Sequence, residues 1–277
     1  MSLAKLQQCL RESRQHVSPF LMLGDPTPDL TVALCRELVA AGATMLELGM
    51  PYADPSADGP VVQAASRRAL ANGVSTDAAL ATLARVRAAC PDTPCNLLVY
   101  GNLVHARGYE RFCADAVQAG ASSLLTPDIP LEEGEVLRRT CREHGLGNVL
   151  LAGPRTGDAR LRAIAQASDA FVYLAGHQGI TGASAAALDR ATRVAHVRRE
   201  IDVPLCVGFG LSAREHIEGV HAAGAELAVV GSHLLRVLAD TLTEHPGDRE
   251  RLLAAVRIAF HQLLPAQRRQ TEIRQCS

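Results

Sequence analysis

Short apolar runs alternate along the chain with longer segments that have helical periodicity. Each run has four or five residues and is predominantly apolar, without regular polar positions. That pattern is typical of parallel strands that are covered on both faces. Glycines such as Gly42, Gly120 and Gly224 stand where several helical segments end, as C-caps do. The expected strands are 19–23, 44–48, 96–99, 122–126, 148–152, 170–174, 204–207 and 227–230.

Eight strand-and-helix units in 277 residues predict an α/β protein with a closed (β/α)8 barrel, the TIM-barrel fold. We expect one domain over residues 1–277, since no Pro- or Ser-rich linker divides the chain. A doubly wound open sheet is the alternative, but it normally shows a glycine fingerprint after the first strand. Here that place is taken by Gly24-Asp25-Pro26. The expected helices are an extra N-terminal one at 3–14, then 29–41, 61–71, 76–89, 108–119, 131–144, 158–167, 187–199, 212–223, 233–243 and 248–264, some of them short extras in loops.

Charge and composition count against several classes of function. Lys and Arg total 28 against 29 Asp and Glu, and no basic stripe points to nucleic acid. No apolar run is long enough to span a bilayer. The N-terminal stretch lacks the apolar core of a signal peptide, so we expect a cytoplasmic protein with no membrane association. The eight cysteines and ten histidines show no metal-ligand spacing, so we expect no metal site.

An acid stands inside the second expected strand. Glu47 lies between Leu46 and Leu48, and Asp58 follows in a loop rich in Pro, Asp and Gly. A carboxylate in a buried strand is costly unless it is paired or used, and barrel enzymes place reacting groups at the carboxyl ends of strands. We therefore interpret Glu47 and Asp58 as a candidate acid–base pair. The alternatives are a structural Glu47 bonded to backbone or Tyr173, and Asp58 as a helix N-cap.

Glycine-rich turns follow the last two expected strands. Gly208–Gly210 come after the seventh strand, and Gly231-Ser232 open the helix after the eighth. Backbone N–H groups in such turns can face a ligand without obstruction by a Cβ, and a helix N-terminus attracts anions. Because barrels often bind a substrate phosphate at this place, we favour an anion site over turns that serve only the backbone. We also expect Ser212 to cap the following helix.

One stretch and several shorter motifs carry a family likeness. The stretch Leu46–Gln63 resembles the signature of the tryptophan synthase alpha chain family. The likeness spans nearly the whole chain, because the other motifs match in the same order. These motifs are Phe20–Pro26, Tyr100–Asn102, Pro127–Glu133, Gly179–Gly182, Val207–Gly210 and Gly231-Ser232.

The resemblance implies a lyase that splits indole-3-glycerol phosphate into indole and glyceraldehyde 3-phosphate by a retro-aldol step. Glu47 would shuttle protons, Asp58 would hold the indole N–H, and Tyr173 would orient the site. Apolar neighbours would raise the pKa of Glu47, whereas the polar loop would keep Asp58 ionised. The matching substrate and phosphate positions are Phe20, Thr181, Gly182, Gly208, Phe209, Gly210, Gly231 and Ser232.

The resemblance also implies a partner. Family members pair with a beta chain that carries pyridoxal phosphate, in an α2β2 tetramer, and the alpha chain needs no cofactor itself. Pro51 and Asp54 match contact positions. The chain departs from the family at Gly176-His177-Gln178, where a small hydroxyl residue followed by Arg is usual in the lid loop. Two other hypotheses stay open: a stand-alone indole-releasing lyase, and a non-catalytic barrel that binds phosphate and activates a partner.

Overall fold

Eight parallel strands close into a barrel within the residues that the structure, a computed structural model, describes (3–12, 15–176 and 183–265). The strands pair in chain order, and β8 pairs with β1 to complete the ring. The predicted (β/α)8 barrel is therefore confirmed, and the open-sheet alternative is wrong. The strands are β1 (His16–Met22), β2 (Leu46–Gly49), β3 (Cys95–Leu98), β4 (Ser123–Leu125), β5 (Gly147–Ala152), β6 (Val172–Leu174), β7 (Leu205–Val207) and β8 (Leu227–Val230).

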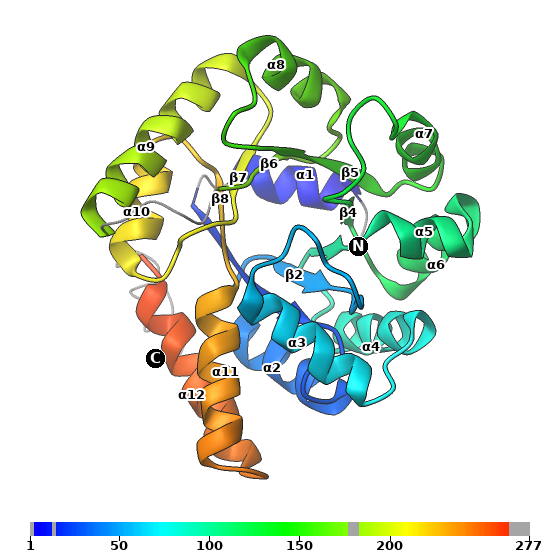
Figure 1. Cartoon of the computed structure of the whole chain (residues 1–277), viewed down its shortest axis with the longest axis vertical. Helices are drawn as coiled ribbons and strands as arrows, with labels where there is room; N and C mark the ends of the chain where they lie inside the picture. Colours follow the sequence, from blue (N-terminus) through cyan, green and yellow to red (C-terminus); the bar gives the residue numbers. More distant parts are fainter. Residues whose placement is uncertain (1–2, 13–14, 177–182, 266–277) are drawn as a thin grey trace.

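Helices surround the strands on the outside of the barrel (Figure 1). They bury their apolar faces against the strands, so the core includes both the barrel interior and the layer between strands and helices. The helices are α1 (Leu3–Glu12), α2 (Pro28–Ala40), α3 (Pro60–Ala71), α4 (Thr76–Ala89), α5 (Gly101–Arg107), α6 (Tyr109–Ala119), α7 (Glu135–Glu143), α8 (Asp158–Ala167), α9 (Ala183–Glu200), α10 (Arg214–Ala222), α11 (Ser232–Glu244) and α12 (Arg249–Leu263).

The N-terminal helix α1 covers the amino-terminal end of the barrel and is drawn behind the strands in Figure 1. Its residues Leu6 and Leu10 are buried. The Gln7 side chain donates a hydrogen bond to the carbonyl oxygen of Asp169, just before β6, at 2.7 Å. The carboxyl ends of the strands, where barrel enzymes place their sites, remain uncovered by this helix.

Strand pairing places the side chains of four neighbouring strands at one level of the barrel. Phe20 pairs with Glu47, Glu47 with Asn96, and Asn96 with Ser123. Paired residues of adjacent strands direct their side chains to the same side of the sheet. All four residues are buried. Because buried polar groups need hydrogen-bond partners, this register makes the carboxyl, amide and hydroxyl groups depend on one another.

Some helix boundaries differ from the prediction. Helix α5 was not expected, because its seven residues begin with a glycine and are too few to show helical periodicity. Helix α9 begins at Ala183, four residues before the expected start. Helix α10 begins at Arg214, and its N-cap is Ala213. The expected cap by Ser212 is therefore wrong, since this residue lies too far from the helix.

Two further observations concern the described residues as a group. No helix among them is long and apolar enough to cross a membrane. No three of their His, Cys, Asp or Glu side chains gather closely enough to hold a metal ion.

Candidate active site

A cavity of about 720 Å³ lies at the carboxyl ends of the strands. Its lining comes from β1 to β6 and β8, from the loop before α3, from the loops after β4 to β8, and from α3, α9 and α11. Thr181 and Gly182 lie outside the described residues, as does His177. The other residues that we expected at the substrate site all line this cavity: Phe20, Glu47, Asp58, Tyr173, Gly208, Phe209, Gly210, Gly231 and Ser232.

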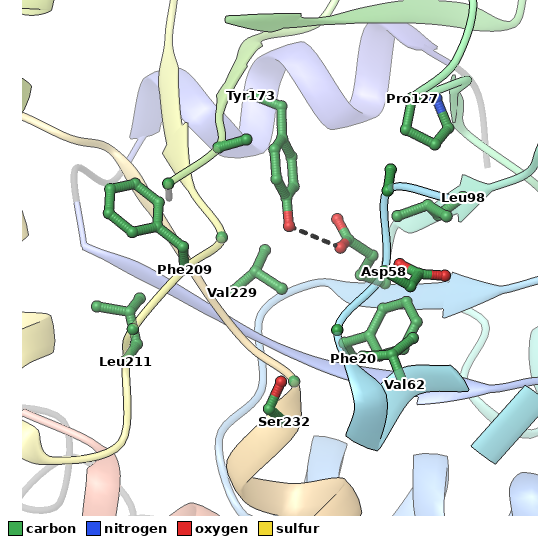
Figure 2. A pocket seen from close by; sticks show the side chains of 18 of the residues that line it. Phe20, Asp58, Val62, Leu98, Pro127, Tyr173, Phe209, Leu211, Val229 and Ser232 are labelled. Atoms are coloured by element: carbon green, nitrogen blue, oxygen red, sulfur yellow. Dashed lines mark hydrogen bonds between the residues drawn. The ribbon is translucent and has the colours of Figure 1, made fainter. Parts of the chain in front are cut away.

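The cavity has two chemically different ends, which we call the acid end and the turn end. The acid end contains Glu47 and Asp58, and the turn end contains Gly208–Gly210 and the start of α11. Tyr173 lies between the two ends. Figure 2 shows Asp58, Phe20, Val62 and Leu98 on one side of the cavity and Phe209 and Leu211 on the facing side.

Glu47 is held by hydrogen bonds on both carboxylate oxygens. Its side chain is buried, and the Tyr173 hydroxyl donates to Oε1 at 3.1 Å. The Asn96 amide donates to Oε2 at 3.0 Å. The Ser123 hydroxyl donates to Asn96 Oδ1 at 2.7 Å, which leaves the amide nitrogen of Asn96 facing Glu47. The carboxylate therefore has a fixed position before any ligand binds.

Burial raises the pKa of Glu47 to about 7. The hydrogen bonds from Asn96 and Tyr173 oppose this shift, and the charge of Asp58 adds to it. A pKa close to neutral lets a carboxyl group both donate and accept a proton at physiological pH, as a proton-shuttling group must. Both acids line the same cavity.

Asp58 lies in the loop just before α3, and the structure does not use it as a helix cap. The N-cap of α3 is Gly59, and no side chain caps this helix. The N-cap alternative for Asp58 is therefore wrong. Burial raises the pKa of Asp58 to about 6, against a hydrogen bond from Tyr100 that lowers the pKa. Asp58 is thus mainly ionised at neutral pH, by a narrower margin than a polar loop alone would give.

The turn end combines a close backbone approach with an open helix terminus. A Cβ on Gly208 would lie 1.7 Å from the Tyr173 hydroxyl oxygen, so only glycine fits there. Gly210 has a φ of +66°, which favours glycine. Helix α11 begins at Ser232, after Gly231, without a side-chain cap. Its first-turn N–H groups are available to an anion in the cavity.

Sequence reasoning missed several residues that shape this cavity. Asn96 and Ser123 hold Glu47, and polar residues inside apolar strands could have signalled them. Tyr100 contacts the Asp58 loop, where its hydroxyl accepts a hydrogen bond from the Ala57 N–H at 3.0 Å. Three arginines also line the cavity, and no spacing in the sequence distinguishes them from surface arginines: Arg190, Arg193 and Arg236.

The two expected partner-contact residues lie outside the cavity lining. Asp54 is exposed, whereas Pro51 is buried in the isolated chain. Both follow the carboxyl end of β2, on the segment that leads to Asp58. Their contact with a partner stays a prediction.

A parallel barrel with carboxyl groups, a buried tyrosine and an open helix terminus at the carboxyl ends of its strands belongs to the TIM-barrel enzymes. The family model of the tryptophan synthase alpha chain matches residues 6–264. The chain belongs to the tryptophan synthase alpha chain family.

Individual relatives agree with this assignment. The tryptophan synthase alpha chain of Synechococcus sp. is 42% identical over 236 residues, which cover 85% of this chain and 87% of that one. The Corynebacterium diphtheriae alpha chain is 39% identical over 233 residues, with 82% and 83% covered.

Solved structures of the same family share the fold. Tryptophan synthase subunit alpha from Legionella pneumophila has a TM-score of 0.82 at 30% identity, covering 94% of this chain and 98% of that one. A chain from the tryptophan synthase α2β2 complex of Pyrococcus furiosus has a TM-score of 0.80 at 29% identity, with 91% and 98% covered.

Proposed function

We propose that this chain cleaves indole-3-glycerol phosphate into indole and glyceraldehyde 3-phosphate, as the alpha subunit of a tryptophan synthase. One observation carries the proposal: Glu47 and Asp58 line the same cavity as the amide-rich turn end. Family membership supports the choice of substrate. The size of the cavity, about 720 Å³, lies in the range of sites for small organic ligands.

The reaction needs a proton to be added at one atom and removed at another. Glu47 donates a proton to C3 of the indole, and the Asp58 carboxylate holds the ring N–H and stabilises positive charge on the ring. Glu47, now ionised, accepts the proton of the hydroxyl on the adjacent carbon. The C–C bond then breaks, its electrons return to the ring, and an aldehyde forms. The pKa of Glu47 near 7 suits both of its steps.

The cavity lining supports this orientation of the substrate. Apolar side chains at the acid end, among them Phe20, Val62 and Leu98, offer a wall for the flat indole ring. The phosphate would then reach the turn end, where the N-terminus of α11 and the turn at Gly208–Gly210 present N–H groups. Tyr173, bonded to Glu47, separates the two parts.

We infer that a beta chain is the partner. The similar chain from Pyrococcus furiosus belongs to a tryptophan synthase α2β2 complex with mutual activation, which supports the same assembly here. Pyridoxal phosphate would belong to that beta chain, and Pro51 and Asp54 would contribute to the contact. The proposed compartment of the assembly is the cytoplasm.

The test is indole release from indole-3-glycerol phosphate by the purified chain, alone and with a tryptophan synthase beta chain. Slow release that rises sharply with the beta chain supports the alpha-subunit function. Fast release by the chain alone favours a stand-alone lyase. Retained binding of the substrate without release in either case would contradict the lyase and favour a non-catalytic barrel.

A further inference from the structure

Arg190 lies at the turn end of the cavity with its guanidinium group buried. The residue is on α9 and lines the cavity, yet only 7% of it is exposed. Its charge lowers the pKa of His216, after the larger effect of burial, so the guanidinium lies near the start of α10. A buried arginine is unusual unless it has a partner.

No such partner is present in the part of the chain that the structure describes. The Nε atom of Arg190 is buried and makes no hydrogen bond there. Other arginines with low exposure do have partners: Arg68 pairs with Asp25 at 2.7 Å, and Arg107 pairs with Asp77 at 2.7 Å. Arg193, one turn further along α9, also has a buried Nε without a hydrogen bond, but its Nη2 donates to the carbonyl oxygen of Thr156 at 2.8 Å. Among the described residues, Arg190 thus keeps a desolvated charge without a carboxylate against it, which is costly in an isolated chain.

The turn after β7 is shaped around this guanidinium. The group lies over the Phe209 ring, 5.9 Å from its centroid, which is a cation–π arrangement. A Cβ on Gly210 would lie 2.7 Å from Arg190 Nη2, so the missing side chain of this glycine leaves room for the guanidinium. The same turn lies beside the open N-terminus of α11 in the cavity lining. The Arg190 guanidinium therefore lies against a turn of the same cavity in which N–H groups are available to an anion.

We propose that the Arg190 guanidinium binds the phosphate group of the substrate, together with the backbone N–H groups of the turn end. This inference rests on the proposed function, because it needs a phosphorylated substrate in the cavity. A guanidinium offers a planar pair of N–H donors that matches two phosphate oxygens. Backbone amides alone supply partial charges, whereas a full positive charge selects a doubly negative phosphate monoester over a neutral or singly charged group.

The surrounding charges agree with an anionic ligand. Arg193 and Arg236 line the same cavity, as does the acidic residue Asp189. Asp189 is exposed, so water screens its charge more than that of the buried Arg190. The Ser212 N–H donates to Nδ1 of His216 at 3.3 Å, which requires that ring nitrogen to be unprotonated. Positive charge therefore dominates at the turn end.

The test is the dissociation constant of glycerol 3-phosphate, measured by calorimetry with the full chain. Arg190→Met keeps a side chain of similar length without charge, and we expect it to weaken binding by roughly 10- to 100-fold. Arg190→Lys should lose less, since it keeps the charge but not the paired donors. Arg199→Met, an exposed position on the same helix, is the matched control and should bind as the wild type does. Indole, which lacks a phosphate, should bind all four proteins equally.

Thermal unfolding separates a ligand-binding role from a structural one. Without ligand, Arg190→Met should be at least as stable as the wild type, because the substitution removes an unpaired buried charge. Saturating glycerol 3-phosphate should raise its Tm by less than it raises that of the wild type. If Arg190→Met does not fold, Arg190→Gln is measured with the same expectations.

The possible results separate this inference from the proposed function. A lower Tm with an unchanged dissociation constant would show that Arg190 is structural, and would overturn the inference alone. A wild-type chain that does not bind glycerol 3-phosphate would overturn the phosphate site itself, and with it the proposed function. Wild-type binding that is lost in Arg190→Met and kept in Arg199→Met supports both.

Discussion

The acid end and the turn end of the cavity differ in how their polar groups are satisfied. At the acid end, both oxygens of Glu47 accept hydrogen bonds from protein side chains, and the Asn96 amide is itself fixed by Ser123. At the turn end, α11 starts without a side-chain cap, and Arg190 Nε has no partner among the described residues. One end is complete within the chain, and the other has donors that a ligand can satisfy.

This difference suggests separate tasks for the two ends. Groups that transfer protons must hold their geometry through the reaction, and a completed hydrogen-bond network provides that. Groups that bind substrate can keep unpaired donors, since the ligand compensates for their desolvation. Changes at the acid end should therefore alter turnover most, and changes at the turn end should alter binding most.

The largest expected effect is on turnover at the acid end. Glu47→Gln keeps the size of the side chain but removes the group that exchanges protons, so indole release should fall by about 1,000-fold or more. Single-turnover release of indole from indole-3-glycerol phosphate measures this change. Glu218→Gln, at an exposed position on α10, is the control. Near-native release by Glu47→Gln would remove the proton-shuttling role.

A smaller loss is expected for the second acid. Asp58→Asn removes the negative charge opposite the indole N–H, and release should fall by about 100-fold. Asp240→Asn, at an exposed position on α11, should release indole as the wild type does. Equal rates for the two variants would mean that the charge of Asp58 takes no part in the reaction.

The glycine that joins the two ends gives a third test. In Gly208→Ala, the new Cβ would lie 1.7 Å from the Tyr173 hydroxyl oxygen, so the tyrosine must move away from Glu47. We expect a loss of about 10-fold in turnover, since overpacking displaces a group that positions the acid. Gly219→Ala, where a Cβ meets no neighbour, is the control. Unchanged turnover in Gly208→Ala would show that the turn end does not affect Glu47 through Tyr173.

The smallest effect concerns stability and pH. Burial raises the pKa of Glu47 to about 7 from an ordinary value of 4.5. Between pH 4.5 and pH 7, the carboxyl group is therefore mainly protonated in the folded chain and mainly ionised in the unfolded chain. The resulting stabilisation is present below pH 4.5 and is lost as the pH rises through about 7.

Between pH 6 and pH 7, the wild type should therefore lose roughly 1 kcal/mol more unfolding free energy than Glu47→Gln, which cannot ionise there. Urea unfolding of both proteins at both pH values measures this difference. If both proteins lose the same unfolding free energy between these pH values, the pKa of Glu47 is not raised in the folded chain.

Much of the fold follows from local patterns, whereas the cavity depends on contacts between strands. The apolar runs and terminal glycines predicted all eight strands, because each pattern lies within a few residues. Glu47 could also be predicted as a site residue, since burying a carboxylate in an apolar strand is costly unless it is paired or has a function. Its partner Asn96 was missed, because the register that brings it beside Glu47 joins residues 49 positions apart.

Arg190 shows the same limit at the turn end. Its burial depends on the rotation of α9 and on a glycine turn twenty residues later. The residues next to Arg190 in the sequence predict neither. The wrong cap at Ser212 has a simpler cause. Helix α10 starts two residues later than its apolar pattern suggests, a common error at helix ends.

The most direct test of the central claim is a crystal structure of Glu47→Gln with indole-3-glycerol phosphate, since slow turnover should preserve the bound substrate. We expect one molecule to span the cavity, with its ring N–H on the Asp58 carboxylate and its phosphate between the Gly208–Gly210 turn and the start of α11. A phosphate bound elsewhere, or an indole ring remote from Asp58, would contradict the account.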